Sequence, residues 1–435
     1  MNLGKLGKES KVSHLTLESV HVFPSIPMSP AGHHTTLTWR GNPSGQTRRE
    51  RMPAQYRAYI PDPIADHEPR LSGALSQLLS EADSAVRQLN RLDPARAHQI
   101  EALARQLLRQ ESLASSRIEG LALSHKRIGE AAYDPRGSAD ERAKAVLGNI
   151  EAMNQAIRVG ATTEAITGET IVDLHHTLMA STEPGIAGSV REEQNWVGGS
   201  WHTPVGAEFV PPPHEEVKAL LEDLAEFMNR TDLPAALQGA LTHAQFETIH
   251  PFADGNGRVG RCLIHVIFKR RGLADHHVPP VSLLMATDLD GYVKALTAYR
   301  NDREEEWTGY FAQTTVAAAQ AGEEFGEQLH ELQESWRAKA GARRGSTAEK
   351  VIDLLPGQPV IDVQTAARLA GTSSEAARTA LNRLEERAVI RRANKKNWGR
   401  VWEAQGLWNL LDRFEERLAR TRGQGRLSRP APTTR

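Results

Sequence analysis

One short stretch of the chain, from His250 to Arg261, brings together side chains and turn residues that could do chemistry. His250 supplies a base that titrates near neutral pH, and Asp254 supplies a hard oxygen ligand suited to Mg²⁺. The turn Gly255-Asn256-Gly257 can direct several backbone N–H groups into one concavity and hold an anion there. Arg258 and Arg261 are three positions apart, so on a helix they would share a face. Together these groups predict a site for polyphosphate chemistry.

The apolar residues that follow the turn predict the element that positions this site. Their spacing is typical of a buried helix that begins at the turn; they are Val259, Cys262, Leu263, Val266 and Ile267. The positive end of the helix dipole and its unpaired N–H groups would then face the same anion. The alternative is a simple tight turn, because Asp, Gly and Asn dominate turns. The neighbouring base and arginines argue against that alternative.

The same stretch resembles the signature of the Fic (Fido-domain) family, His-x-Phe-x-Asp/Glu-Gly-Asn-Gly-Arg-x-x-Arg. Every fixed position is met, with Phe252 at the one position not yet mentioned. A match of this length is far more specific than a lone glycine motif. The resemblance implies an enzyme that transfers AMP from ATP to a Ser, Thr or Tyr hydroxyl of a target protein and releases pyrophosphate.

The resemblance also implies a role for each residue of the stretch. His250 would be the general base that removes the hydroxyl proton, and Asp254 would hold Mg²⁺ between the α- and β-phosphates of ATP. Arg258 and Arg261 would neutralise the β- and γ-phosphates, while Phe252 would anchor the loop in the core. The whole ATP and phosphate site would comprise Asp254, Gly255, Asn256, Gly257, Arg258, Val259, Gly260 and Arg261.

A helix is predicted over about 97–119, and it ends in an unusual way. Glu119 lies in its last turn, where the helix dipole disfavours negative charge, and Ser115 precedes it by one turn on the same face. A surface glutamate in water is the alternative to a tertiary partner. The segment from Ser115 to Gly120 resembles the Fic-family inhibitory motif, Ser/Thr-x-x-x-Glu-Gly/Asn. The resemblance implies that Glu119, assisted by Ser115, binds Arg261 and inhibits the enzyme.

Residues 184–213 are rich in Gly, Pro and β-forming residues, which predicts a short β-hairpin. A surface hairpin without function is the alternative. By the Fic resemblance the hairpin would be a flap, whose residues nearest the nucleotide are Val197, Gly198, Gly199 and Ser200. The flap would pair main chain to main chain with an extended segment of the target protein, or of the enzyme itself.

Further candidate residues lie in the predicted helices. Either Tyr292 or Tyr299 would contact the adenine, or both would pack in the core. His243 is expected to be a structural hydrogen-bonding residue. His175 and His176 are adjacent and so point to different faces of a helix, which argues against a shared metal site.

Residues 346–420 look like a separate module. A helix, a turn at Gly371, a second helix and a basic hairpin resemble a winged helix-turn-helix. Residues 361–403 hold nine Lys and Arg against five Asp and Glu, so DNA is a candidate partner. Its phosphates would meet Arg378, Arg383, Lys395 and Lys396. Winged helices also dock proteins or dimerise, so a protein partner or a homodimer is the alternative.

Length and composition limit the remaining choices. The 435 residues are enough for two or three domains, 39% are hydrophobic, and the formal net charge is −1. No apolar run is long enough for a membrane span and no apolar signal core is evident, so a cytoplasmic protein without membrane contact is expected. The single cysteine, Cys262, excludes an intramolecular disulfide and a Cys-based zinc site.

The expected architecture is mainly α, with a Fic-type helical bundle, a β-hairpin flap and a small winged-helix domain. Its predicted parts are a disordered segment 1–45, an N-terminal helical region 46–157, the catalytic domain 158–320, a helical linker 321–345, the module 346–420 and a disordered tail 421–435. A second hypothesis is a DNA-binding transcriptional regulator whose Fic domain has a secondary or AMP-removing activity.

Overall fold

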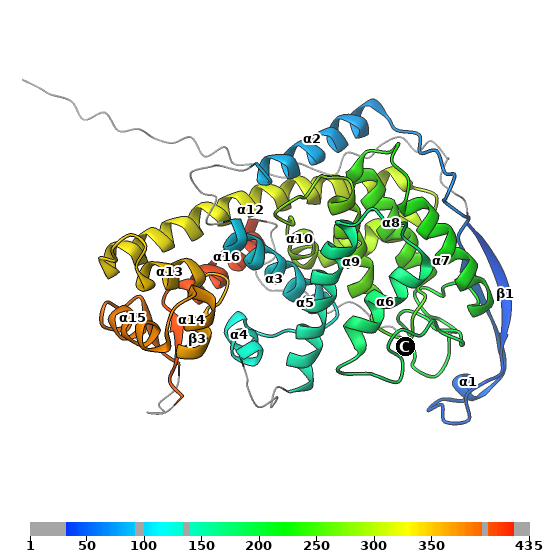
Figure 1. Ribbon diagram of the computed structural model, residues 1–435. Helices are drawn as coiled ribbons and strands as arrows, with labels where there is room; N and C mark the ends of the chain where they lie inside the picture. The colour runs from blue at the N-terminus through cyan, green and yellow to red at the C-terminus, as the bar shows by residue number, and fades with distance from the viewer. Residues whose placement is uncertain (1–31, 92–99, 134–139, 394–398, 422–435) are drawn as a thin grey trace, which may run out of the picture.

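The computed structural model describes residues 32–91, 100–133, 140–393 and 399–421, and helices dominate these ranges (Figure 1). The helices are α1 (Arg48–Arg51), α2 (Gly73–Leu89), α3 (Ile100–Ile118), α4 (His125–Tyr133), α5 (Glu141–Gly160), α6 (Gly168–Met179), α7 (His214–Met228), α8 (Ala235–Ile249), α9 (Asn256–Arg270), α10 (Val281–Thr287), α11 (Leu289–Tyr299), α12 (Glu304–Ala340), α13 (Thr347–Leu354), α14 (Val363–Ala370), α15 (Ser374–Glu386) and α16 (Leu407–Thr421). The strands are β1 (His33–Trp39), β2 (Ala54–Ile60), β3 (Val360–Asp362), β4 (Ile390–Arg392) and β5 (Val401–Ala404). The prediction of a mainly helical protein is confirmed.

Helices α8 and α9 form the centre of the bundle, with α3, α5 and α6 packed against α9. Every residue of α8 is buried, and so is every residue of α9 from Asn256 to Phe268. A helix that is buried on all sides must be apolar or hydrogen-bonded all round. The α8–α9 pair can therefore hold polar site residues rigidly, because the surrounding helices leave it no freedom to shift.

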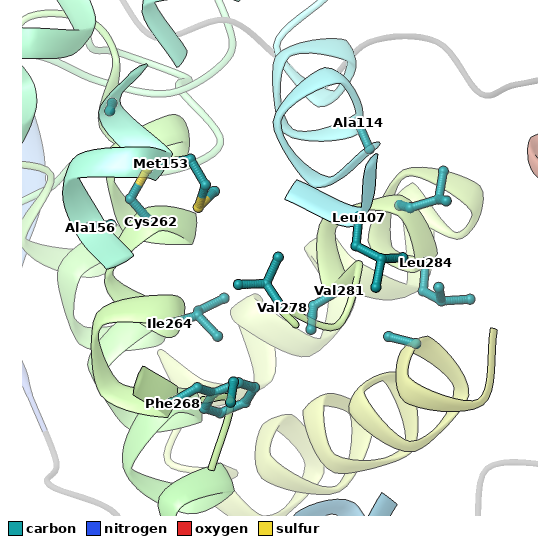
Figure 2. Packing of buried hydrophobic residues seen from close by; sticks show 14 of the residues in the cluster. Leu107, Ala114, Met153, Ala156, Cys262, Ile264, Phe268, Val278, Val281 and Leu284 are labelled. Carbon is teal, nitrogen blue, oxygen red and sulfur yellow. The ribbon is translucent and has the colours of Figure 1, made fainter. Parts of the chain in front are cut away.

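The packing around α9 confirms the predicted burial of Cys262. Figure 2 shows Cys262 beside Met153 of α5, and it shows Leu107 of α3 against Leu284 of α10. Burial raises the pKa of the Cys262 thiol to about 12, so the thiol is neutral and behaves as a small apolar side chain. Through these contacts α3 is packed onto the same core that supports α9.

The expected boundary between a catalytic domain ending at 320 and a helical linker 321–345 falls inside the long helix α12. One continuous helix of 37 residues crosses that boundary and lies beside α2 along one side of the molecule (Figure 1). Its second half buries Phe325, Leu329 and Trp336. Burial continues from there into α13, β5 and α16, so the C-terminal elements share one hydrophobic core with the bundle.

The C-terminal elements follow the order that the sequence predicts. Helix α14 ends at Gly371, which has a φ of 61°, and α15 begins directly after it. The three short strands form an antiparallel sheet in the order β3-β5-β4. Residues 394–398, which include the hairpin residues Lys395 and Lys396, lie outside the described residues. The classification as a winged helix stays a prediction.

The predicted disordered segment 1–45 is wrong for residues 33–39, which form strand β1 and pair in antiparallel register with β2. Thr35, Leu37 and Trp39 are half-buried and alternate with exposed residues, as expected for a strand with one covered face. The ribbon is fixed at its other edge, where Tyr59 N–H donates to Val210 O at 2.9 Å. Residues 1–31 and 422–435, also predicted to be disordered, lie outside the described residues.

The predicted flap hairpin of residues 184–213 has no regular strand. Two isolated bridges organise it, Val190 with Phe252 and Val197 with Phe209. None of the described helices is both long and apolar enough to cross a membrane.

Candidate active site

The loop between α8 and α9 carries the site and is shaped by two left-handed residues. His250 ends α8 with φ 52° and ψ 59°, and Gly255 precedes α9 with a φ of 81°. A histidine in this conformation is uncommon and marks a constrained position. The side chain of Asn256 closes the loop, because its Oδ1 accepts from Phe252 N–H at 2.9 Å and its Nδ2 donates to Phe252 O at 2.8 Å. The side-chain amide of Asn256 therefore serves the loop, and its contribution to an anion would come from the backbone N–H.

His175 of α6 supports the same loop from outside, a role that the sequence analysis missed. Its ring stacks on Phe252 with the centroids 3.8 Å apart, and its Nε2 donates to Asp254 O at 3.1 Å. Its Nδ1 accepts from Gly188 N–H at 3.1 Å. Burial lowers the pKa of His175 to about 4, so the ring stays neutral and keeps this donor–acceptor pattern. No local sequence pattern could have identified these contacts.

The base of the flap is hydrogen-bonded to the loop. Arg191 donates from Nε to His250 O and from its backbone N–H to Pro251 O, both at 2.9 Å. Asn195 donates from Nδ2 to Phe252 O at 3.0 Å. The flap is thereby fixed next to His250, which is where a target segment would have to lie if its hydroxyl is to reach this base.

The predicted anion nest lies at the start of α9. Gly255 offers no side chain to cap the helix, so the first N–H groups of α9 depend on other partners. The carboxylate of Glu119 lies directly over this turn, because a Cβ added to Gly257 would collide with Glu119 Oε1. A protein carboxylate thus occupies the place where the helix dipole favours an anion.

Arg261 makes the contact with Glu119 that the inhibitory-motif resemblance implied. Its Nη2 donates to Glu119 Oε1 at 2.7 Å and to Ser115 O at 2.9 Å, while its Nε donates to Ser115 Oγ at 2.9 Å. Glu119 receives one of these hydrogen bonds, so the pair is not bidentate. Burial alone would lower the pKa of Arg261, but the charge of Glu119 together with Tyr292 and Glu247 offsets this and raises it. The guanidinium is charged, and both its Nε and its Nη2 donate hydrogen bonds.

Arg258 and Asp254 make fewer and longer hydrogen bonds than Arg261 does. Arg258 is buried, and its Nη2 donates to Asp254 Oδ2 at a long 3.3 Å, while its Nε has no hydrogen-bond partner among the described residues. The Asp254 side chain is 55% exposed. Asp254 is a lone carboxylate, since the described residues contain no cluster of three His, Cys, Asp or Glu that could bind a metal. A Mg²⁺ ion at Asp254 would therefore take its other ligands from water and substrate phosphates, which is its usual preference.

His250 is buried beside two cations. Burial, followed by the charges of Arg300 and Arg191, lowers its pKa to about 3, so the imidazole is neutral and able to accept a proton at pH 7. Its Nδ1 lies 3.4 Å from Glu247 O. Because a carbonyl oxygen only accepts, this contact favours the tautomer with the proton on Nδ1, in which Nε2 is the basic nitrogen.

The contacts of the flap residues and of the two tyrosines are with other parts of the fold. Gly198 and Gly199 have φ of 73° and 74° and so form the turn of the flap. Val197 bridges to Phe209, and Ser200 Oγ donates to the carboxylate of Glu50 in α1. Tyr292 and Tyr299 are both buried, with hydroxyls bonded to His243 and Gln245 of α8. Core packing, the alternative to an adenine contact, is what the structure describes for both rings. The structural role predicted for His243 is confirmed.

The predicted nucleic-acid contacts of the C-terminal module are only partly available. Arg383 is exposed, but its Nη2 donates to Ala340 O and Gly341 O at 3.0 and 2.7 Å, so it caps the end of α12. Arg378 is largely exposed next to Glu375.

Comparisons with known proteins match the same part of the chain. The Fic/DOC family profile matches residues 165–268, which include α6 to α9, and the Fic/DOC N-terminal profile matches residues 76–158, which include α3 and α5. The chain is 31% identical to the protein adenylyltransferase fic-1 of Caenorhabditis elegans over 139 residues, which are 32% of this chain and 25% of that protein. It is 41% identical to the probable protein adenylyltransferase of Aquifex aeolicus over 69 residues, 16% of this chain and 22% of that protein.

A solved structure of a Fic family protein from Desulfovibrio desulfuricans aligns with a TM-score of 0.48 at 19% identity, covering 78% of this chain and 99% of that one. The chain spans about a quarter of the length of the curated relatives it matches. Residues 76–158 and 165–268 are thus similar to the two regions of the Fic/DOC family, and the complete signature lies within the second match.

Proposed function

We propose that this protein is an adenylyltransferase, which transfers AMP from ATP to a Ser, Thr or Tyr hydroxyl of a target protein. One observation carries the proposal: a buried neutral base, His250, stands at one end of the loop whose other end is the uncapped N-terminus of α9. The curated relatives of the catalytic region bear the name protein adenylyltransferase, which points to the same reaction.

In the proposed reaction, the phosphates of ATP lie over the first turn of α9. Arg258 offers its unpaired Nε, and Arg261 turns to the β- and γ-phosphates once Glu119 releases it. The target hydroxyl gives its proton to His250 Nε2 while its oxygen bonds to the α-phosphorus and pyrophosphate leaves with the bonding electrons. Mg²⁺, which Asp254 would hold, supplies further charge neutralisation for the phosphates. Orientation and electrostatic stabilisation provide most of the rate, as in other phosphoryl transfers.

The flap provides the surface for the target in this proposal. Its base is hydrogen-bonded to residues 250–252, so a target strand paired with the flap backbone would come close to His250. Main-chain pairing reads an extended conformation more than a particular side chain. The target is therefore an extended segment bearing a hydroxyl, either of another protein or of this protein itself.

Glu119 inhibits the resting enzyme in the same proposal. Its carboxylate binds Arg261 and covers the turn at Gly257, so it competes with phosphate for both the guanidinium and the helix N-terminus. ATP then binds weakly, or with its α-phosphorus turned away from the hydroxyl, and misorientation alone can remove most of the rate.

The test of the proposed function is His250→Ala in a Glu119→Gly background, where transfer should be measurable. We expect α-labelled ATP to be transferred to the protein itself, with the rate falling at least ~10²-fold in the His250 variant while ATP binding persists. His176→Ala, a change at an exposed histidine of α6, is the matched control. Intact-mass spectrometry reads the added AMP. The same added mass with and without His250 would reject the general-base assignment, and no added AMP in any variant or on any lysate protein would reject the function.

A second activity, DNA binding, rests on the basic excess of residues 361–403 and on exposed Arg378. Fluorescence anisotropy of the full chain with duplex DNA should give an affinity that falls steeply with salt. No binding at low salt would leave protein docking or dimerisation as the role of the module.

A further inference from the structure

Glu247, on the last turn of α8, is a buried carboxylate that the proposed mechanism does not use. It is 7% exposed, and its Oε1 has no hydrogen-bond partner among the described residues. Burying a carboxylate without full hydrogen bonding costs several kcal/mol. The rest of α8 is buried and largely apolar, so an apolar residue would fit this position at lower cost. Stability therefore does not explain why a glutamate stands here.

The two oxygens of Glu247 face the two helices that build the site. Oε2 lies 3.9 Å from His250 Nδ1, and Oε1 lies against Gly260 of α9, where an added Cβ would approach it to 2.8 Å. Glycine at position 260 thus makes room for the carboxylate between α8 and α9. The backbone oxygen of Glu247 accepts from Arg300 Nη2 at 3.0 Å and lies 3.4 Å from the same Nδ1. One residue therefore faces His250 through both its backbone and its side chain.

The charges around Glu247 come from several helices. Arg261 of α9 and Arg300, directly after α11, are cations, and Glu119 at the end of α3 is an anion. His250 is on the same helix as Glu247, and the neutral phenol of Tyr292 and imidazole of His243 lie nearby. Burial, with a smaller effect of Glu119 and against Arg261 and Arg300, raises the pKa of Glu247 to about 7. Its charge is consequently sensitive to pH in the physiological range.

The surroundings of His250 disfavour the protonated imidazolium that a general base must form. Burial, Arg300 and Arg191 all disfavour its protonated form, yet a general base must carry the proton as the transition state forms. An anion on the Nδ1 side would offset these effects, because opposite charges nearby favour the charged form of a group. The Glu247 carboxylate is such an anion, with Oε2 3.9 Å from Nδ1.

We propose that Glu247 is a positioning residue, which orients His250 through Nδ1 and stabilises the imidazolium that forms when Nε2 accepts the hydroxyl proton. This inference rests on the proposed function. The proton moves from the target hydroxyl to Nε2, the new bond forms between that oxygen and the α-phosphorus, and the bond to pyrophosphate breaks. Glu247 takes no proton from substrate. Its backbone oxygen lies 3.4 Å from Nδ1 and its carboxylate lies 3.9 Å from the same nitrogen, and His250 later releases the proton to water. The arrangement follows the logic of a base oriented by a neighbouring carboxylate.

The first test is Glu247→Gln in the Glu119→Gly background, which keeps the size of the side chain and removes its charge. We expect kcat to fall by at least ~10-fold while the KM for ATP stays within about twofold, because Glu247 acts through the base. The acid limb of the pH–rate profile should also move to lower pH, since that limb reports ionisation of Glu247 near pH 7. Glu304→Gln is the matched control. Glu304 has the same exposed fraction of 7%, and its partner is His67, which is not part of the loop between α8 and α9.

A second measurement does not depend on transfer. In protein with ¹⁵N-labelled histidine, the His250 ring, assigned by its absence in His250→Ala, should show a protonated Nδ1 at neutral pH. That resonance should shift in Glu247→Gln, where a neutral amide replaces the charged carboxylate 3.9 Å from Nδ1. If transfer occurs but kcat and the pH profile are the same in Glu247→Gln, or if Nδ1 is unprotonated, the inference is wrong. Absence of transfer in every variant would reject the proposed function, and the nitrogen resonances would still decide the position of Glu247.

Discussion

Two glutamates, one within α3 and one directly after it, reach the core of the candidate site in different ways. Glu111, in the middle of α3, is fully buried; it bonds to His265 Nε2 of α9 at 2.8 Å and accepts from Ser282 N–H at 2.7 Å. Glu119, at the end of α3, is 22% exposed and bonds to Arg261 of α9 at 2.7 Å. The contacts of Glu111 are buried in the core between helices. The carboxylate of Glu119 lies over the first turn of α9, where the helix dipole favours any anion.

This difference teaches how the proposed inhibition would be released. The buried contacts of Glu111 keep α3 attached to α9 and α10, so the helix cannot leave without unfolding part of the core. The Glu119 side chain needs only to rotate away from Arg261, and a phosphate could take its place. On this view inhibition is released when a phosphate replaces the Glu119 carboxylate at Arg261, while α3 stays in position.

The largest expected effect comes from Glu111→Ala. It would leave the N–H and O–H of Ser282 and the ring of His265 without their shared acceptor in a site that excludes water. Breaking a buried network of this kind costs about 3–5 kcal/mol. We expect a large fall in the free energy of unfolding, measured by urea denaturation, and no rise in transfer by the folded fraction. Transfer equal to that of Glu119→Gly would erase the distinction between the two glutamates.

Glu119→Gly should change transfer strongly and stability little, the reverse of Glu111→Ala. We expect transfer to rise tenfold or more, which is about 1.4 kcal/mol or above in the barrier, with little change in stability because the residue lies at a helix end where the dipole disfavours its charge. Measurement with α-labelled ATP at equal protein concentrations would show it. The double variant Glu119→Gly with Arg261→Ala should lose the gain, since the released arginine is its cause. A Glu119→Gly protein as silent as the wild type would contradict autoinhibition.

These two glutamates also show what the sequence could and could not predict. The Glu119–Arg261 contact could be expected because both residues lie in recognisable local motifs, and α9 begins at the predicted turn. The Glu111–His265 contact could not, because each residue alone looks like an ordinary polar residue on a helix. Its partners come together only when α3, α9 and α10 pack, and no pattern within one helix records that packing.

The same limit explains the other differences. Strand β1 lies in a segment expected to be disordered, because its stability comes from pairing with β2 and from the attachment of Tyr59 to Val210, which are long-range contacts. His175 supports the site through a ring stacked on Phe252 from another helix. The linker expected at 321–345 is helical, and the burial of Trp336, whose Nε1 donates to Gln405 O, comes from tertiary contacts. Local periodicity predicted the helices, and tertiary contacts decided the rest.

A smaller effect is expected at Glu415 of α16, which binds the C-terminal end of α3 next to Glu119. Its carboxylate bonds to Arg117 at 2.7 Å and to His125 at 2.8 Å, on either side of Glu119 in sequence. Burial would raise the pKa of Glu415, but His125 and Arg117 together lower it. A carboxylate with a lowered folded pKa contributes stability above its unfolded pKa, and the contribution is lost as pH falls through the folded value.

Glu415→Gln should therefore lower the free energy of unfolding by about 1 kcal/mol at pH 7, since it turns charge-assisted hydrogen bonds into neutral ones. The difference from wild type should shrink as the pH is lowered. Urea denaturation at several pH values measures it, with Glu416→Gln on the same helix as the control. A constant difference at all pH values would mean that the ion pair contributes nothing to this attachment.

The smallest effect is expected for Ser115→Ala, and it tests how Arg261 is shared. Ser115 binds Arg261 twice, through Oγ and through its backbone oxygen, and the substitution removes only the first of these hydrogen bonds. A hydrogen bond to a charged group contributes about 1.5–3 kcal/mol, but the remaining contacts to Glu119 and Ser115 O keep the guanidinium in place. We expect transfer to rise by about two- to threefold, well below the effect of Glu119→Gly. Ser116→Ala is the matched control, because its hydroxyl bonds to Ser112 O within α3 and not to α9. If Ser115→Ala activates as strongly as Glu119→Gly, then the serine and not the carboxylate restrains Arg261, and the contrast between the two glutamates loses its basis.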